Sequence, residues 1–131
     1  METTTIHGQY LTTILTVDRV ETDQDYRVDI YLTADIDGTA YRLDGILWRG
    51  SDFEFGFDEE PDNYEVEDAM EKVGEFFYST KGIEFLRAAV RKAGYTFKAD
   101  GSVYSPAELT MKLAFGNNPS NWPFNQAREV K

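Results

Sequence analysis

The first sixty residues of the chain alternate between apolar and polar side chains, as β-strands do when they bury one face. The alternation is clearest over 26–34, where every second side chain is apolar. It recurs over 11–18, 39–48 and 52–58, and the last of these ranges places three phenylalanines on one face. We therefore expect a four-stranded antiparallel β-meander in the N-terminal half, with one face on the core and the other toward water.

Short turn signals separate these expected strands. Residues 21–25 are all polar, and Asp37-Gly38 is typical of a hairpin turn because glycine accepts a positive φ. Asp35 and Asp37 resemble the start of a calcium loop, but the remaining EF-hand ligands do not follow, so we interpret them as turn residues. The alternation of the third strand breaks at Asp44-Gly45, which predicts a β-bulge there.

After Pro61 the apolar spacing changes to every third or fourth residue, which is the period of an amphipathic helix. Two such stripes cover 65–79 and 80–93. Either Asp62 or Asn63 can cap the first one. The pattern does not decide whether the two stripes form one kinked helix or two helices.

The C-terminal third predicts smaller elements. A short second hairpin is expected near 96–104, around Asp100-Gly101. Ser105-Pro106 is a strong helix start, which makes a third helix possible. The remaining tail, 117–131, holds two large aromatic residues and is either docked or flexible. Strands precede helices along the chain, so we expect a single α+β domain over 1–131.

Composition excludes several classes of function. The chain has 131 residues, 41% of them hydrophobic, with no cysteine and only one histidine, His7. This rules out disulfides, a cysteine nucleophile and a zinc site built from cysteine or several histidines. No apolar run approaches the ~20 residues of a membrane span, and the N-terminus does not look like a signal peptide. We expect a soluble, cytoplasmic protein.

Motifs that would indicate an enzyme are missing from the sequence. It contains no glycine-rich phosphate loop and no G-x-S-x-G nucleophile elbow. Pairs of carboxylates occur by chance in any chain with 24 acidic residues, so they do not indicate a glycosidase. We therefore expect a non-enzymatic protein with no cofactor and no bound metal.

The charge is strongly uneven. The formal net charge is -11; residues 1–75 hold 20 acidic and 5 basic side chains, whereas residues 76–131 hold 4 and 8. The acids are densest over 52–75, where Lys72 is the only base. Such a surface repels nucleic acids and anionic membranes and favours basic partners. A solvated strand face followed by a solvated helix face would give the same pattern.

Interpreted as a partner surface, this segment supplies two rows of carboxylates. One row alternates along the expected strand 52–58, and the other repeats every fourth residue along the first helix. Exposed tyrosines would anchor the edges of the surface. The predicted partner-binding residues are Asp52, Glu54, Asp58, Glu59, Glu60, Asp62, Tyr64, Glu67, Asp68, Glu71, Glu75 and Tyr78.

The later part of the chain holds a modest basic patch beside two aromatic residues: Lys81, Arg87, Arg91, Lys92 and Lys98, with Tyr95 and Phe97. Such a patch could bind a nucleic-acid strand. Cations late in a helix also offset its dipole, and the low overall isoelectric point favours that structural interpretation. No direct DNA binding is expected.

This small, acidic, cysteine-free α+β profile resembles that of phage-encoded inhibitors, such as anti-CRISPR proteins and DNA-mimic antirestriction proteins. It is equally similar to immunity proteins that neutralise nuclease toxins. No residue string assigns a family, so no functional residues follow from the resemblance. The leading hypothesis is an inhibitor that sequesters a basic, nucleic-acid-handling protein. The alternative is an assembly subunit of a phage or multi-protein complex, and a homodimer is also possible.

Overall fold

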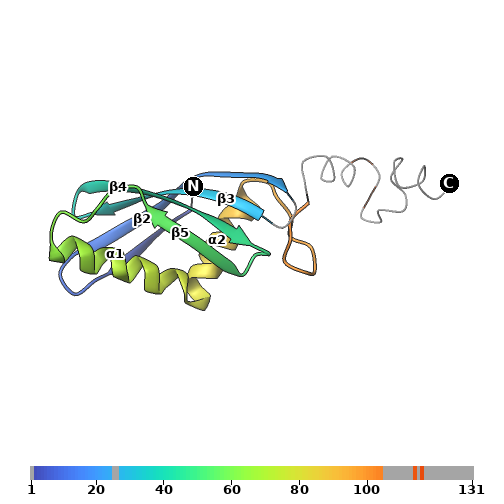
Figure 1. Ribbon diagram of the computed structural model, residues 1–131. Helices are drawn as coiled ribbons and strands as arrows, with labels where there is room; N and C mark the ends of the chain where they lie inside the picture. The colour runs from blue at the N-terminus through green and yellow to red at the C-terminus, as the bar shows by residue number, and fades with distance from the viewer. Residues whose placement is uncertain (1, 25–26, 105–113, 115, 117–131) are drawn as a thin grey trace.

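The computed structural model describes residues 2–24, 27–104, 114 and 116 (Figure 1). The elements are β1 (Thr3–His7), β2 (Thr12–Gln24), β3 (Arg27–Ile36), β4 (Thr39–Trp48), β5 (Asp52–Phe57), α1 (Tyr64–Phe77) and α2 (Thr80–Lys92). Each strand pairs antiparallel with the next, in the order β1-β2-β3-β4-β5, and the sheet curls into a half-barrel. The α+β class and the meander are confirmed, but the sheet has five strands and not four.

The additional strand is β1, which sequence patterning missed. Its residues are Thr-Thr-Thr-Ile-His, so Ile6 is its only apolar residue and no alternation is visible. β1 nevertheless pairs along its whole length with β2, with Thr3 opposite Thr16 and His7 opposite Thr12. β-branched threonines favour such extended pairing even on a surface that is largely polar.

The predicted turn was wrong over 21–24, because β2 continues through Gln24, and the last residue of that turn lies outside the described residues. Within this polar stretch, Glu21 pairs with Asp29 and Gln24 pairs with Arg27 of β3. Thr22 is buried, and its hydroxyl donates a hydrogen bond to the Arg27 carbonyl at 2.6 Å. A polar residue can therefore occupy an inward strand position where the backbone offers it a partner. The register shifts of the sheet also lie in β2, between Val17 and Arg19 and between Glu21 and Gln24.

The predicted bulge at Asp44-Gly45 was wrong as well. β4 pairs with β3 and with β5 in unbroken register. Gly45 occupies an inward position, where a Cβ atom would lie 2.6 Å from the Phe53 ring. The apparent break in alternation arises because the Phe53 ring fills the space that a side chain at position 45 would need.

Two helices pack on the inner face of the sheet. α1 buries Val66, Ala69, Val73 and Phe77, and α2 buries Leu86, Ala89 and Val90. The Phe77 ring lies edge-on to Phe53 at 4.8 Å and to Phe55 at 4.9 Å between ring centroids. The prediction that three phenylalanines share one face of β5 is confirmed, and two of them, Phe53 and Phe55, contact α1.

The two helical stripes form separate helices. Asn63 caps α1, its side chain accepting a hydrogen bond from the Val66 N–H at 3.0 Å. Tyr78 ends α1, and Ser79 caps α2 by accepting a hydrogen bond from the Gly82 N–H at 3.1 Å. The connection is therefore only two residues long, which fixes the two helices relative to each other.

The segment after α2 is a small hairpin. Gly94, at φ 101°, follows the end of α2 as predicted. The hairpin is held by a single β-bridge between Phe97 and Val103, and Gly101 turns it at φ 88°. The helix expected from Ser105 and the tail 117–131 lie outside the described residues.

Candidate protein-binding surface

The solvent side of α1 carries a continuous row of exposed side chains. They follow one another at intervals of three, four, four and three residues, which keeps them on one side of a helix. We call this row the acidic stripe; it consists of Tyr64, Glu67, Glu71, Glu75 and Tyr78. The buried residues of α1 lie on the opposite side, so the stripe faces away from the sheet.

Of the three acids of the stripe, Glu75 alone has an ion-pair partner among the described residues. Lys72 is the only base of α1, and its Nζ lies 3.5 Å from the Glu75 carboxylate. Among the described residues, Glu67 and Glu71 form no ion pair, and no ion pair joins the acids of 52–75 to a base beyond residue 76. The stripe therefore presents its negative charge to solvent.

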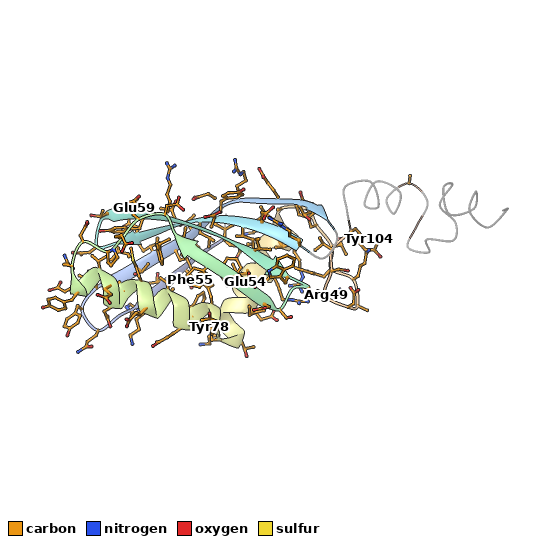
Figure 2. The ribbon with its side chains drawn as sticks, in the orientation of Figure 1. Arg49, Glu54, Phe55, Glu59, Tyr78 and Tyr104 are labelled. Carbon is orange, nitrogen blue, oxygen red and sulfur yellow. The ribbon has the colours of Figure 1, made fainter. Side chains whose placement is uncertain are left out.

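Two exposed tyrosines bracket the acids. Tyr64 is 65% exposed at the start of α1, and Tyr78 is 82% exposed at its end. Fourteen residues of helix at 1.5 Å each place them about 21 Å apart along the axis. Figure 2 shows Tyr78 at the end of α1, away from the sheet. Large side chains in such positions can contact a partner without rearranging the core.

A third tyrosine, which sequence reasoning missed, extends this surface. The Tyr10 ring lies edge-on to the Tyr64 ring with 5.5 Å between centroids, and Tyr10 is 50% exposed. The loop between β1 and β2 is held against α1 because the Gln9 N–H donates to the Asp68 carboxylate at 3.0 Å. Nothing in the sequence marks this contact, since it joins residues 59 positions apart. Asp68 therefore has a structural role.

The carboxylates of β5 lie on a different surface. Asp52, Glu54 and Asp58 alternate with the phenylalanines and project from the outer face of the sheet. Glu54 is opposite Ile46, and Asp52 is opposite Trp48. The outer sheet face and the acidic stripe belong to different layers of the fold, so the predicted residues do not form one continuous plane.

The loop between these two surfaces holds the remaining predicted residues. Glu59 and Glu60 are exposed. Asp62 accepts a hydrogen bond from the Tyr41 hydroxyl at 2.7 Å, and this bond raises the pKa of Tyr41. Asp62, like Asp68, thus contributes to holding the fold together.

Three of the four cations of α2 also have structural contacts, whereas the fourth, Lys81, is exposed. The Arg87 guanidinium donates to the Gly50 carbonyl at 2.8 Å and lies 4.5 Å from the centroid of the Phe97 ring. Arg91 lies 5.4 Å from the same centroid, and Lys92 pairs with Glu2 at 2.9 Å. These contacts join α2 to the β4–β5 turn, the small hairpin and the N-terminus. They favour the structural interpretation of the basic patch.

In the part of the chain that the structure describes, the potential metal ligands are dispersed. No three potential ligand side chains converge there on one point, and Asp35 accepts the Gly38 N–H at 2.8 Å as a turn residue does. Neither described helix has the length and apolar character of a membrane span. Comparison with family models, with curated proteins and with solved structures finds no match to this chain.

Proposed function

We propose that this chain is a non-enzymatic binding protein that inhibits or sequesters a basic, nucleic-acid-handling protein. The observation that carries the proposal is the acidic stripe, a straight row of solvent-facing carboxylates between two exposed tyrosines. Successive acids stand about 6 Å apart along the helix axis. A linear negative potential of this kind attracts a groove of arginine and lysine side chains built for a phosphate backbone.

Local stability does not explain the row. Like charges four residues apart destabilise a helix by a few tenths of a kcal/mol for each pair. Glu75 also lies in the last turn of α1, where the helix dipole disfavours a negative charge and no base is present. A row that costs stability is expected to have a role outside the fold. The tyrosines at its ends supply the aromatic anchors that protein interfaces favour.

The test compares two variants with equal charge. E67Q/E71Q/E75Q neutralises the stripe, and D37N/D44N/E84Q removes the same charge from exposed positions elsewhere. Each protein, like the wild type, is used as bait in an extract of the source organism. Captured proteins are eluted by a salt gradient and challenged with duplex DNA as competitor.

We expect the stripe variant, but not the control variant, to lose the captured protein by about ten-fold or more. That protein should elute with salt and be displaced by DNA, because its cations bind either surface. The proposal is wrong if both variants behave alike, or if the captured protein is insensitive to salt.

A further inference from the structure

Among the described residues, β5 is the last strand of the sheet and has no neighbouring strand on its outer edge. In the part of the chain that the structure describes, β5 pairs with β4 alone, and α1 contacts β5 through the inner-face rings of Phe53 and Phe55. The Asp58 N–H donates to the Arg42 carbonyl at 2.9 Å, and bonded positions alternate along an antiparallel pair. The N–H and C=O groups of Phe53, Phe55 and Phe57 therefore point toward the open edge. Within the described residues, none of these three N–H groups has a hydrogen-bond acceptor.

Side chains on the two sides of this edge differ in character. On the outer side, Asp52 and Glu54 are exposed and stand about 6.8 Å apart, with Asp58 two positions beyond Gly56. A Cβ atom at Gly56 would meet no described atom within 4 Å, so the outer side has space at this position. On the inner side, Phe53 is buried but Phe55 and Phe57 are only partly buried.

We propose that the β5 edge binds an extended basic segment of a partner protein as a sixth strand. Its backbone would bond to the edge groups of the three phenylalanines, as in other cases of β-strand addition. Arginine or lysine side chains at every second position would meet Asp52 and Glu54, and the apolar side chains between them would cover Phe55 and Phe57. This inference rests on the proposed function and names the element of the partner that is recognised.

The same charges disfavour other occupants of the edge. Pairing of two β5 strands from two copies of the chain would bring their carboxylates close together, and like charges across a strand pair are destabilising. The strand at the other end of the sheet, β1, carries threonines and His7 and offers no charge to select a basic segment. Acidic side chains beside an open edge also suppress non-specific pairing.

The test uses a blocked seven-residue peptide of alternating arginine and valine, with the full chain isotopically labelled for NMR. Two control peptides have the same sequence and charge but carry N-methyl groups on either the arginine or the valine amides. In one of these two control peptides, the methyl groups replace the N–H donors that would face β5. We expect that peptide to bind about ten-fold more weakly than the parent, which corresponds to the loss of two or three hydrogen bonds. The parent should shift the amide signals of Phe53, Phe55 and Phe57.

A pair of single variants separates this inference from the function proposed for the stripe. Glu54→Gln and Glu71→Gln remove the same charge, one beside the edge and one on α1. We expect Glu54→Gln to weaken peptide binding several-fold and Glu71→Gln to leave it unchanged. Equal binding of all three peptides, or equal effects of the two variants, would overturn strand addition and leave the stripe function standing. If the peptide binds at β5 but the stripe variant captures the partner as well as the wild type does, only the function proposed for the stripe is overturned.

Discussion

α1 and α2 are adjacent in sequence, nearly equal in length and packed on the same sheet, yet their charges have different roles. Most cations of α2 contact the rest of the protein: Arg87 bonds to Gly50, and Lys92 pairs with Glu2. The acids of the stripe on α1 face solvent, apart from the contact of Glu75 with Lys72. A charged residue with a structural contact needs no partner to explain it. The comparison therefore directs the search for function to α1.

The helix ends show the same contrast. α2 has Arg91 and Lys92 in its last turn, where positive charge stabilises a helix. α1 has acids in its first turn, which is favourable, but it has no base in its last turn and carries Glu75 there. The charge distribution of α2 suits its own stability, whereas that of α1 does so only in part.

The largest effect on the free energy of unfolding is expected from substitutions at the glycines of the two helices. A Cβ at Gly82 would lie 1.8 Å from the Phe76 carbonyl oxygen, whereas one at Gly74 would lie at an ordinary 3.6 Å from the Phe55 ring. We expect Gly82→Ala to lower the free energy of unfolding by about 3 kcal/mol or more, because backbone must move at the helix junction. Gly74→Ala should raise it by about 0.5–1 kcal/mol through helix propensity. Urea denaturation measures both. Similar effects of the two substitutions would contradict this account of the junction.

A smaller effect on the free energy of unfolding is expected from a substitution at Arg87. Arg87→Met keeps the apolar stem but removes the hydrogen bond to Gly50 and the contact of the guanidinium with Phe97. We expect a loss of about 1–3 kcal/mol in the free energy of unfolding. Glu71→Gln on α1 is the matched control and should change it by less than about 0.5 kcal/mol. If Glu71→Gln destabilised the fold as much as Arg87→Met, the contrast between the two helices would fail.

The smallest expected effect depends on pH. The hydrogen bond to Asp62 raises the pKa of Tyr41 above its value in the unfolded chain, about 10. The stability contribution is therefore complete below that value and is lost as pH rises through the raised pKa of the folded state. We expect wild type to melt at a higher temperature than Tyr41→Phe near pH 8, with the difference shrinking above about pH 10. A difference that stayed constant across this range would contradict the role of the bond.

Sequence patterning predicted the parts of the fold that depend on local periodicity. The strands β3, β4 and β5 and both helical stripes followed from alternation and helical spacing, and the positive φ of Gly94 followed from its place after a helix. β1 and the full length of β2 were missed because these segments are largely polar, so no alternation of apolar residues marks them. They are strands because they pair with a neighbouring strand. The space for the Phe53 ring over Gly45 was missed because it depends on the adjacent strand.

From the sequence, each residue of the candidate site could be placed only relative to other residues of the same helix or strand. The spacing of Glu67, Glu71 and Glu75 was enough to place them on one side of a helix. Whether the β5 acids share that surface depends on how the layers pack, and the sequence holds no signal for it. Tyr10 was missed for the same reason, since its contact with Tyr64 requires the loop after β1 to lie on α1.

The two-residue connection between α1 and α2 has a consequence for how the molecule moves in solution. Because Ser79 caps α2 directly and Gly82 lies against Phe76, the negative and positive helices cannot reorient independently. The chain therefore carries a permanent electrical asymmetry fixed in its own frame. The electric field of a distant, positively charged partner exerts a torque on this charge distribution and turns α1 toward the partner before the two surfaces touch. A larger fraction of collisions then occurs with α1 facing the partner. Association is therefore fastest at low salt, where the field is screened least.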